Sequence, residues 1–248
     1  MTLHFLLFAA AGLVGSMVNA LAGGAKLFVF PMLLASGLPP LVANATGTAG
    51  IWPGQLSAAT AFRRELAGDF AGLLRRMVPA FFGAFLGALL LINSSETAFL
   101  AVIPFLLAIA VTAIALGPRI TRLVRRLVPP AHIKTTTSAL LFGCGVYGGY
   151  FGAGLGFLLL ATLSLSGEFE FREANAQKNL FAFCLNAVAI VPLTLSGLID
   201  WFAAAGIVTG GLAGGYLGGS LTRLLPETFT RIAVATVGIV LTASFLLR

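Results

Sequence analysis

The amino-acid sequence predicts an all-α polytopic membrane protein with two inverted-topology repeats, each built from a glycine-broken helical hairpin plus three transmembrane helices. Three observations support this prediction. The composition is strongly apolar, the second half of the chain repeats the pattern of the first half, and the basic residues are distributed differently in the two halves.

The composition excludes an ordinary water-soluble domain. Hydrophobic residues make up 58% of the 248 residues and charged residues only 9%, whereas a soluble domain carries roughly 25% charged residues. A bilayer core about 30 Å thick needs about 20 residues per helical crossing, so the chain has room for eight to ten helical segments. The apolar runs are continuous and do not alternate, which excludes a transmembrane β-barrel.

An internal repeat aligns the two halves at an offset of 131 residues. Matches between glycines or alanines carry little weight in this composition, but matches between polar residues do. The polar matches are Asn44 with Asn175, Asp69 with Asp200, and Glu96-Thr97 with Glu227-Thr228. We therefore predict a single membrane domain over 1–248, with a first repeat at 8–117, a basic cytoplasmic linker at 118–138 and a second repeat at 139–248.

Each repeat shows the same order of elements. An apolar stretch broken by glycine (3–36 and 139–167) precedes three predicted helices, at 43–61, 71–92 and 97–116 in the first repeat and at 174–193, 202–222 and 228–247 in the second. Ser95-Glu96 and Pro226-Glu227 are typical helix starts. The first stretch resembles a signal peptide, but no Lys or Arg precedes its apolar core and the second repeat contains its counterpart. We therefore expect it to remain in the protein.

The basic residues indicate how the repeats face the membrane. Arg63, Arg64, Arg75 and Arg76 belong to one loop, and the linker is rich in arginine, so both are expected to be cytoplasmic. If each broken stretch forms a hairpin that enters and leaves on one face, all other Lys and Arg from Arg63 to Arg231, Lys178 included, also lie inside. If each stretch crosses once, Arg172, Lys178, Arg223 and Arg231 lie outside. The first arrangement is favoured, and it makes the repeats inverted, an architecture that places the substrate site near the bilayer midplane.

The glycine breaks are the first candidate part of a binding site. A helix over 25–36 is only about 18 Å long, so the breaks at Gly23-Gly24 and around Gly152 and Gly154 should lie near mid-membrane. Free N–H groups of the half-helices would then point into the protein. The alternative is that glycines serve close helix packing, which we expect for Gly83, Gly87, Gly214 and Gly218.

A polar stripe in each half is the second candidate part. Asn44, Thr48 and Gln55 lie on one helix face because they are spaced i, i+4 and i+11. Their counterparts are Asn175, Asn179 and Asn186, with Thr46 and Gln177 alongside. Hydrogen bonding between helices is an equally good explanation for these amides. Their abundance in both halves, next to the breaks, favours contact with a substrate.

Lys26 follows the first break directly and is the third candidate. A lysine at membrane depth is costly and marks a functional site by default; the alternative is that its ammonium group snorkels to the cytoplasmic face. Phe157 occupies the matching position, so Lys26 breaks the symmetry.

The remaining titratable residues argue against other functions. All eight carboxylates fall in predicted loops or helix ends, whereas a cation carrier usually has one inside. His4 and His132 are far apart in the predicted topology, Cys144 and Cys184 lie in apolar runs, and no nucleophile is paired with a base. We therefore expect no enzyme, no metal and no cofactor, and neutral donors with one lysine favour an anion.

The residues around the breaks resemble a known family. The pattern Gly12, Gly15, Ala22-Gly23-Gly24, Pro31, Gly37-Leu38-Pro39-Pro40, Ala43-Asn44-Ala45-Thr46, Thr48, with its second copy from Gly148 to Asn179, is similar to the TauE/SafE sulfite exporter family of bacterial permeases. The resemblance covers essentially the whole chain. It implies an inner-membrane permease for sulfite, sulfonates or related organic anions, usually with about eight spans, and an anion site at the glycine pair and the following Thr and Asn positions.

These observations predict a secondary transporter in the bacterial inner membrane that exports a small anion, such as sulfite or an organosulfonate, by alternating access. Uptake of a carboxylate or another organic anion, and a membrane enzyme or assembly factor without transport, are the alternatives. The expected partners are a small anionic substrate and the lipid bilayer but no nucleic acid, and a homo-oligomer is left open. The predicted substrate-binding residues are Gly23, Gly24, Lys26, Asn44, Thr46, Thr48, Gln55, Gly152, Gly154, Asn175, Gln177, Asn179 and Asn186.

Overall fold

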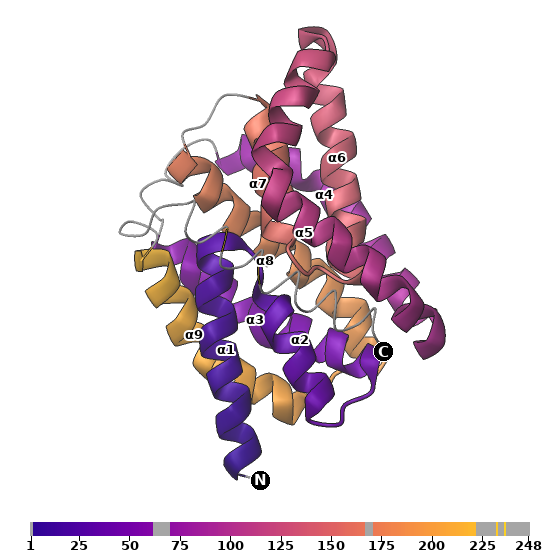
Figure 1. Cartoon of the computed structure of the whole chain (residues 1–248), viewed down its shortest axis with the longest axis vertical. Helices are drawn as coiled ribbons and strands as arrows, with labels where there is room; N and C mark the ends of the chain where they lie inside the picture. The colour runs from indigo at the N-terminus through magenta and orange to yellow at the C-terminus, as the bar shows by residue number, and fades with distance from the viewer. Residues whose placement is uncertain (1, 62–69, 167–170, 222–231, 233–235, 237–248) are drawn as a thin grey trace.

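The computed structural model describes residues 2–61, 70–166 and 171–221 together with residues 232 and 236, and over these residues the protein is helical without any strand (Figure 1). The first half contains α1 (Thr2–Ala22), α2 (Ala25–Ala35), α3 (Pro40–Ala61), α4 (Phe70–Ile92) and α5 (Glu96–Leu127). The second half contains α6 (Ile133–Tyr150), α7 (Leu155–Leu163), α8 (Phe171–Leu195) and α9 (Trp201–Leu221). Two short 3-10 turns, η1 (Pro130–His132) and η2 (Ser164–Ser166), complete the described elements.

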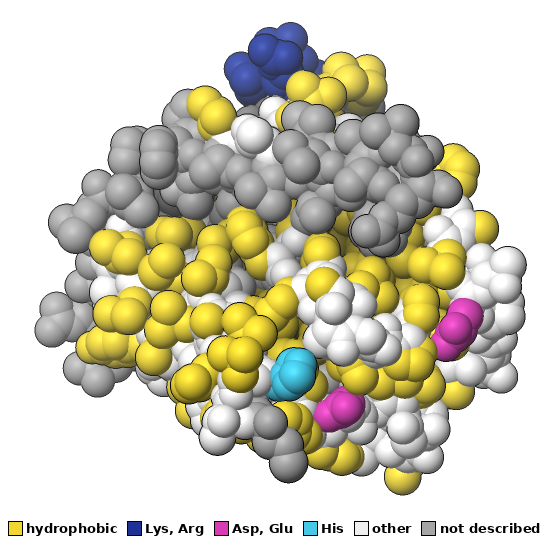
Figure 2. Space-filling view, turned by 60° about the horizontal axis from the view of Figure 1, so that its bottom comes forward, with side chains coloured by type: hydrophobic (Ala, Val, Ile, Leu, Met, Phe, Trp, Pro, Cys, Tyr) yellow, Lys and Arg dark blue, Asp and Glu magenta, His cyan; other side chains and the backbone are white. Residues whose placement is uncertain are grey.

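Four helices are long and apolar enough to cross a membrane, at Thr2–Leu21, Gly72–Ile92, Glu96–Gly117 and Glu173–Leu195. Glycine and polar residues make α3 and α9 less apolar, yet their 22 and 21 residues extend over about 32 Å, which also suffices for a crossing. Many large apolar side chains face outward; Leu195 is 84% exposed and Phe105 71%. Apolar side chains occupy much of the described surface in view in Figure 2, as expected of a protein whose outer surface meets lipid.

The broken apolar stretches form hairpins, because each short helix folds back on the long helix before it. A Cβ atom on Gly15 of α1 would lie 2.7 Å from Val29 Cγ2 of α2. In the second half, Cys144 Sγ of α6 lies 3.6 Å from Thr162 Oγ1 of α7. The 11 residues of α2 and the nine of α7 extend over only about 16 and 14 Å, so neither crosses a bilayer alone.

Glycine is required at the breaks because the backbone there is left-handed. Gly23 has a φ of +79°, Gly152 of +77° and Gly154 of +70°, a region in which a Cβ atom costs roughly 1–2 kcal/mol. These residues end α1 and α6 and let the chain reverse within two to four residues.

Each half contributes one helix that packs against the hairpin of the other half. In the first half α4 packs on α6 of the second, and in the second half α9 packs on α1 of the first. The expected packing role of four glycines is confirmed: a Cβ atom on Gly83 or Gly87 would overlap the backbone of α6, and one on Gly214 or Gly218 that of α1. Contacts advance in the same direction along both helices of each pair, so α4 runs parallel to α6 and α9 runs parallel to α1.

Where α3 crosses α8, residues at equivalent positions of the two halves touch. Trp52 stacks on Phe183 with ring centroids 5.3 Å apart and donates from Nε1 to the Phe183 carbonyl at 3.1 Å. Asn186 Nδ2 donates to Gln55 Oε1 at 2.9 Å. Both pairs are 131 residues apart. In Figure 1, α1 rises from the N-terminus, whereas its counterpart α6 descends from the upper end of the molecule.

The basic residues gather at one end of the molecule. Because α4 and α6 run in parallel, Arg75 and Arg76 at the start of α4 lie at the same end as Lys134, which begins α6. The end of α5, with its four arginines, adjoins the start of α6 through η1. In Figure 2 the Lys and Arg side chains in view stand together at one edge, far from the acidic side chains.

One expectation about the helices was wrong. The helix predicted at 97–116 continues to Leu127 through the arginine-rich segment assigned to the linker. Arginine is a good helix former, and basic side chains in a last turn stabilise the carbonyl end of the helix. The expected start of this helix is confirmed, since Ser95 Oγ accepts a hydrogen bond from Ala98 N at 3.2 Å. The helix predicted at 228–247, the Pro226-Glu227 start and the loop containing Arg63 and Arg64 lie outside the described residues.

Candidate functional site

The two glycine breaks meet inside the protein. Gly156 N, in the first turn of α7, donates to the carbonyl oxygen of Gly23 at 3.3 Å, and a Cβ atom on either glycine would overlap the backbone of the other. Gly24 and Gly154 are the residues before the first turns of α2 and α7. The breaks therefore bring Gly23, Gly24 and Gly154 together, with Gly152 at the end of α6.

Lys26 is buried at this junction and does not reach the surface. Its side chain is only 3% exposed. Its ammonium group donates to Asn44 Oδ1 at 2.8 Å and to the carbonyl oxygen of Phe151, the residue after the last turn of α6. Snorkelling to a membrane face is therefore excluded for this structure.

The polar stripe on α3 is almost fully hydrogen-bonded. Asn44 also donates from Nδ2 to the Tyr150 carbonyl at 2.8 Å. Thr48 donates to the Asn44 carbonyl at 3.0 Å, and Thr46 Oγ1 accepts from the Asp200 backbone at 2.9 Å, which anchors the start of α9. Thr46 and Gln55 therefore bond to other segments, as the structural alternative expects, whereas the hydroxyl group of Thr48 bonds within its own helix.

The stripe on α8 is different, because four polar atoms of its amides lack partners. Asn179 is fully buried, and neither its Oδ1 nor its Nδ2 has a hydrogen-bond partner. Asn175 Oδ1 and Gln177 Oε1 are also buried without partners. An unpaired buried polar atom costs roughly 1–3 kcal/mol, so such a cluster needs an explanation. Of this stripe only Asn186 is accounted for by contact with another helix.

Lys178 is a second buried lysine, which the sequence analysis did not count among the candidate site residues. We placed it with the cytoplasmic basic residues, but it lies within α8 and is 1% exposed. Its ammonium group donates to the carbonyl oxygens of Asn19 and Ala20 in the last turn of α1, at 3.3 and 3.2 Å. A signal was present in the sequence, because Lys178 stands between Asn175 and Asn179 within the polar stripe.

The interior carries positive charge without a described counter-charge. The partners found for both ammonium groups are neutral amide or carbonyl oxygens. The three carboxylates among the described residues, Glu96, Glu173 and Asp200, lie at or before the first turns of helices, as expected. The described residues contain no cluster of metal-binding side chains, and Cys144 and Cys184 are free thiols.

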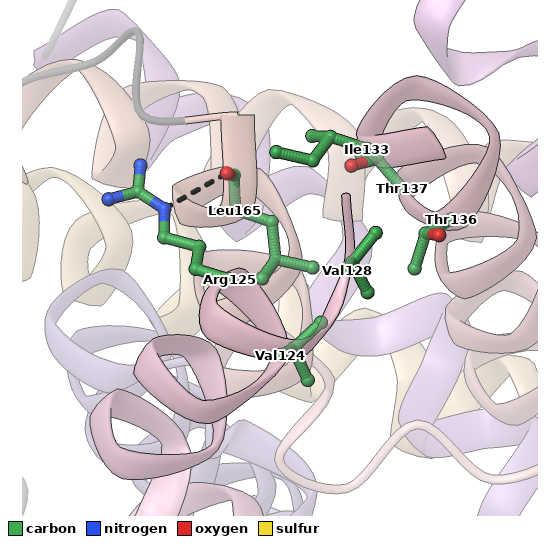
Figure 3. A pocket seen from close by; sticks show the side chains of 7 residues that line it. All are labelled: Val124, Arg125, Val128, Ile133, Thr136, Thr137 and Leu165. Carbon is green, nitrogen blue, oxygen red and sulfur yellow. Dashed lines mark hydrogen bonds between the residues drawn. The ribbon is translucent and has the colours of Figure 1, made fainter. Parts of the chain in front are cut away.

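A small pocket at the basic end of the molecule is separate from these residues (Figure 3). It is lined mainly by apolar side chains of α5 and α6, and Arg125 at its edge donates to the Leu165 carbonyl at 3.0 Å. This bond ties the end of α5 to η2. None of the predicted site residues lines the pocket.

Comparisons with known proteins identify one family model and several relatives. The family model "Sulfite exporter TauE/SafE" matches residues 7–245. A "Probable membrane transporter protein" of Haemophilus influenzae is 29% identical over 94% of this chain and 90% of its own length. The "Probable membrane transporter protein YfcA" of Escherichia coli K12 is 26% identical over 97% and 88%. The "Probable membrane transporter protein ORF9" of Sinorhizobium is 29% identical over 79% and 74%. No solved structure matches the chain.

Proposed function

Because the chain belongs to the TauE/SafE sulfite exporter family, we propose that it is a secondary transporter that exports a small anion such as sulfite or an organosulfonate. The family and the relatives establish the coarser statement: the chain is a multi-pass membrane transporter and not an enzyme. A bacterial inner membrane is consistent with the source of these relatives. The substrate and the direction are the parts we propose.

An anionic substrate is supported by the chemistry of the buried polar groups. The ammonium group of Lys26 is buried at the breaks and the amides of Asn175 and Asn179 are buried on α8, whereas the carboxylates of the described residues lie at helix starts. Ammonium and amide N–H groups donate hydrogen bonds to an oxyanion. Such donors are stronger in a low-dielectric interior than in water, and a cation substrate would meet no acid among them.

Alternating access is supported by the packing of the two halves. Each half supplies a hairpin and a helix that packs on the other half's hairpin, and equivalent residues touch where α3 crosses α8. Contact between equivalent residues is expected beside a two-fold axis that relates inverted repeats. We propose that the site between the breaks opens alternately to each face, and that the direct contact of Gly23 with Gly156 represents a closed arrangement.

The test is flux into proteoliposomes that contain the purified protein. We expect saturable uptake of radiolabelled sulfite or of an organosulfonate such as isethionate, strong loss of that flux in Lys26→Met, and no such loss in Lys134→Gln, which changes an exposed lysine at the basic end. Acetate and chloride test carboxylate and halide transport. Flux of carboxylates alone would show that the proposed substrate is wrong. Flux of cations alone would refute an anion transporter.

The orientation of the halves is tested separately by cysteine labelling in intact cells. In a Cys144→Ala, Cys184→Ala background, Ser196→Cys lies in the exposed turn between α8 and α9, and His132→Cys is exposed at the basic end. We expect a membrane-impermeant maleimide to label the first from outside the cell and the second only after lysis. Labelling of both from outside would contradict a basic cytoplasmic end.

A further inference from the structure

We propose that Lys26 and Lys178 form a two-lysine latch: each ammonium group holds the end of the other half's broken helix, and the transported anion opens the latch by binding both groups. This inference rests on the proposed function. It adds Lys178 to the anion site and states what substrate binding changes.

Each of the two lysines donates hydrogen bonds to carbonyl groups of the other half. Lys26 belongs to the first half and binds the Phe151 carbonyl at the end of α6, in the second half. Lys178 belongs to the second half and binds the Asn19 and Ala20 carbonyls at the end of α1, in the first half. Each lysine therefore connects the two halves at the junction of the breaks.

Each lysine binds one carbonyl group at an equivalent position, and the second carbonyl group that Lys178 binds is equivalent to the one that Asn44 binds. Offsets of 131 residues pair Ala20 with Phe151 and Asn19 with Tyr150, the same offset that separates the touching residues on α3 and α8. The lysines themselves are not equivalent, since Lys26 aligns with Phe157 and Lys178 with Gly47. Two different sequence positions thus supply a lysine bond to the equivalent Ala20 and Phe151 carbonyls, one in each half. The sequence asymmetry at Lys26 is therefore matched by Lys178 in the structure.

The carbonyl ends of helices attract cations but cannot neutralise them. A helix end carries about half a negative charge, and the other partners of the two lysines are neutral oxygens. A full negative charge between the breaks interacts more strongly with a buried ammonium group than a helix end does. An oxyanion that enters therefore competes with the carbonyl groups for both lysines.

The unpaired amides stand beside Lys178. Asn179 follows it in the chain, and Asn175 lies one helical turn earlier on the same face as Asn179. Asn179 is fully buried with both polar atoms unpartnered. An anion bound by Lys178 would provide an acceptor for Asn179 Nδ2, a buried donor without a partner in the described protein.

Releasing the lysines would also loosen the contact between the breaks. A Cβ atom on Gly156 would lie 3.2 Å from Lys178 Cδ, so the stem of this lysine packs against the break itself. When the ammonium groups leave the carbonyl ends of α1 and α6, the Gly156–Gly23 hydrogen bond is the only break-to-break bond found between the described residues. Anion binding then favours separation of the hairpins.

The first experiment measures sulfite binding and flux in Lys178→Gln, Lys178→Arg and the control Lys134→Gln. We expect the Lys178→Gln affinity to fall at least tenfold, Lys178→Arg to keep most of it because the charge remains, and the control to match the wild type. If the wild type transports sulfite and Lys178→Gln binds it with unchanged affinity, the latch is refuted while the transporter stands. If the wild type transports no anion, the proposed function itself fails.

The second experiment measures hydrogen exchange of the break amides, which a purely structural lysine would not couple to the anion. We expect sulfite to raise deuterium uptake over 19–25 and 150–157 in the wild type. Lys178→Gln should show the raised uptake without sulfite and no further response. If that variant does not yield monodisperse protein, Lys26→Gln must show the same two changes. Uptake that is unaffected by sulfite in the wild type would overturn the latch.

Discussion

The polar stripes of α3 and α8 occupy equivalent positions in the two halves but differ in their hydrogen bonding. On α3, Asn44 uses both polar atoms of its amide, and Thr46, Thr48 and Gln55 each have a partner. On α8, the amides of Asn175, Gln177 and Asn179 have buried atoms without partners. One stripe therefore acts as a scaffold, and the other has capacity left for a ligand.

The difference comes from where each half places its lysine. In the first half, Lys26 on α2 donates to the Phe151 carbonyl. Asn44 on α3 donates to the Tyr150 carbonyl. In the second half, Lys178 lies on α8 itself and takes both equivalent carbonyls. Asn175, the counterpart of Asn44, has an unpaired Oδ1, because Phe157 stands where Lys26 donates to Asn44 in the first half. The two halves thus carry their lysines on different helices, α2 in the first half and α8 in the second, and the hydrogen bonding of the polar stripes differs accordingly.

The largest contrast in stability is expected between Asn44→Ala and Asn175→Ala. Removal of Asn44 takes away one of the two acceptors found for the Lys26 ammonium group and leaves the Tyr150 carbonyl without its side-chain donor, and loss of a hydrogen bond to a charged group costs about 1.5–3 kcal/mol. Asn175→Ala should cost less than about 1.5 kcal/mol, because it removes an unpaired atom. Thermal unfolding in detergent measures both changes, and equal losses would erase the distinction between the two stripes.

A smaller effect is expected for the one bond that joins the stripes. Gln55→Ala and Asn186→Ala should each destabilise the protein, with a coupling free energy of about 0.6–1.7 kcal/mol between them, the range of side-chain hydrogen bonds in membrane proteins. A double-mutant cycle with Gln55→Ala/Asn186→Ala measures this coupling. A coupling of zero would mean that α3 and α8 do not depend on this contact.

A further contrast tests Thr46 against Gln177. Thr46→Val removes the acceptor of the Asp200 N–H and should cost about 1 kcal/mol, the net value of one hydrogen bond. Gln177→Leu removes an unpaired oxygen and should change the free energy of unfolding by less than about 0.5 kcal/mol. If Gln177→Leu is the more destabilising variant, the amide has a partner in the native protein that makes α8 a scaffold as well.

The smallest effect on stability, and the largest on ligand response, is expected for Asn179→Leu. Leucine has a similar size and no polar atom to leave unpaired, so the protein without sulfite should be as stable as the wild type or slightly more stable. Sulfite should no longer raise the unfolding temperature, because the amide donor is lost. Wild-type stabilisation by sulfite in this variant would remove Asn179 from the anion site.

Much of the fold was predictable because bilayer burial and backbone chemistry act locally. Apolar runs separated by turn residues placed α4 at 71–92, within one residue of its observed start. The glycine breaks and the close packing of Gly83 and Gly214 followed from residues that lack a Cβ atom. The length of α5 was underestimated, because an arginine-rich segment can continue a helix as readily as it can end one.

The sequence by itself determined that this chain is a helical membrane protein, where its helices break, and that its buried helices are rich in amides; the three carboxylates in the described part of the chain lie at helix starts, as it predicted. Only the tertiary structure decided which of these amides have partners and that Lys178 is buried. Its contact with Ala20 spans 158 residues of chain and that of Lys26 with Phe151 spans 125. Such bonds depend on how the two halves pack, since a hydrogen bond requires two groups within about 3 Å, and no pattern along one helix specifies which distant carbonyl lies there.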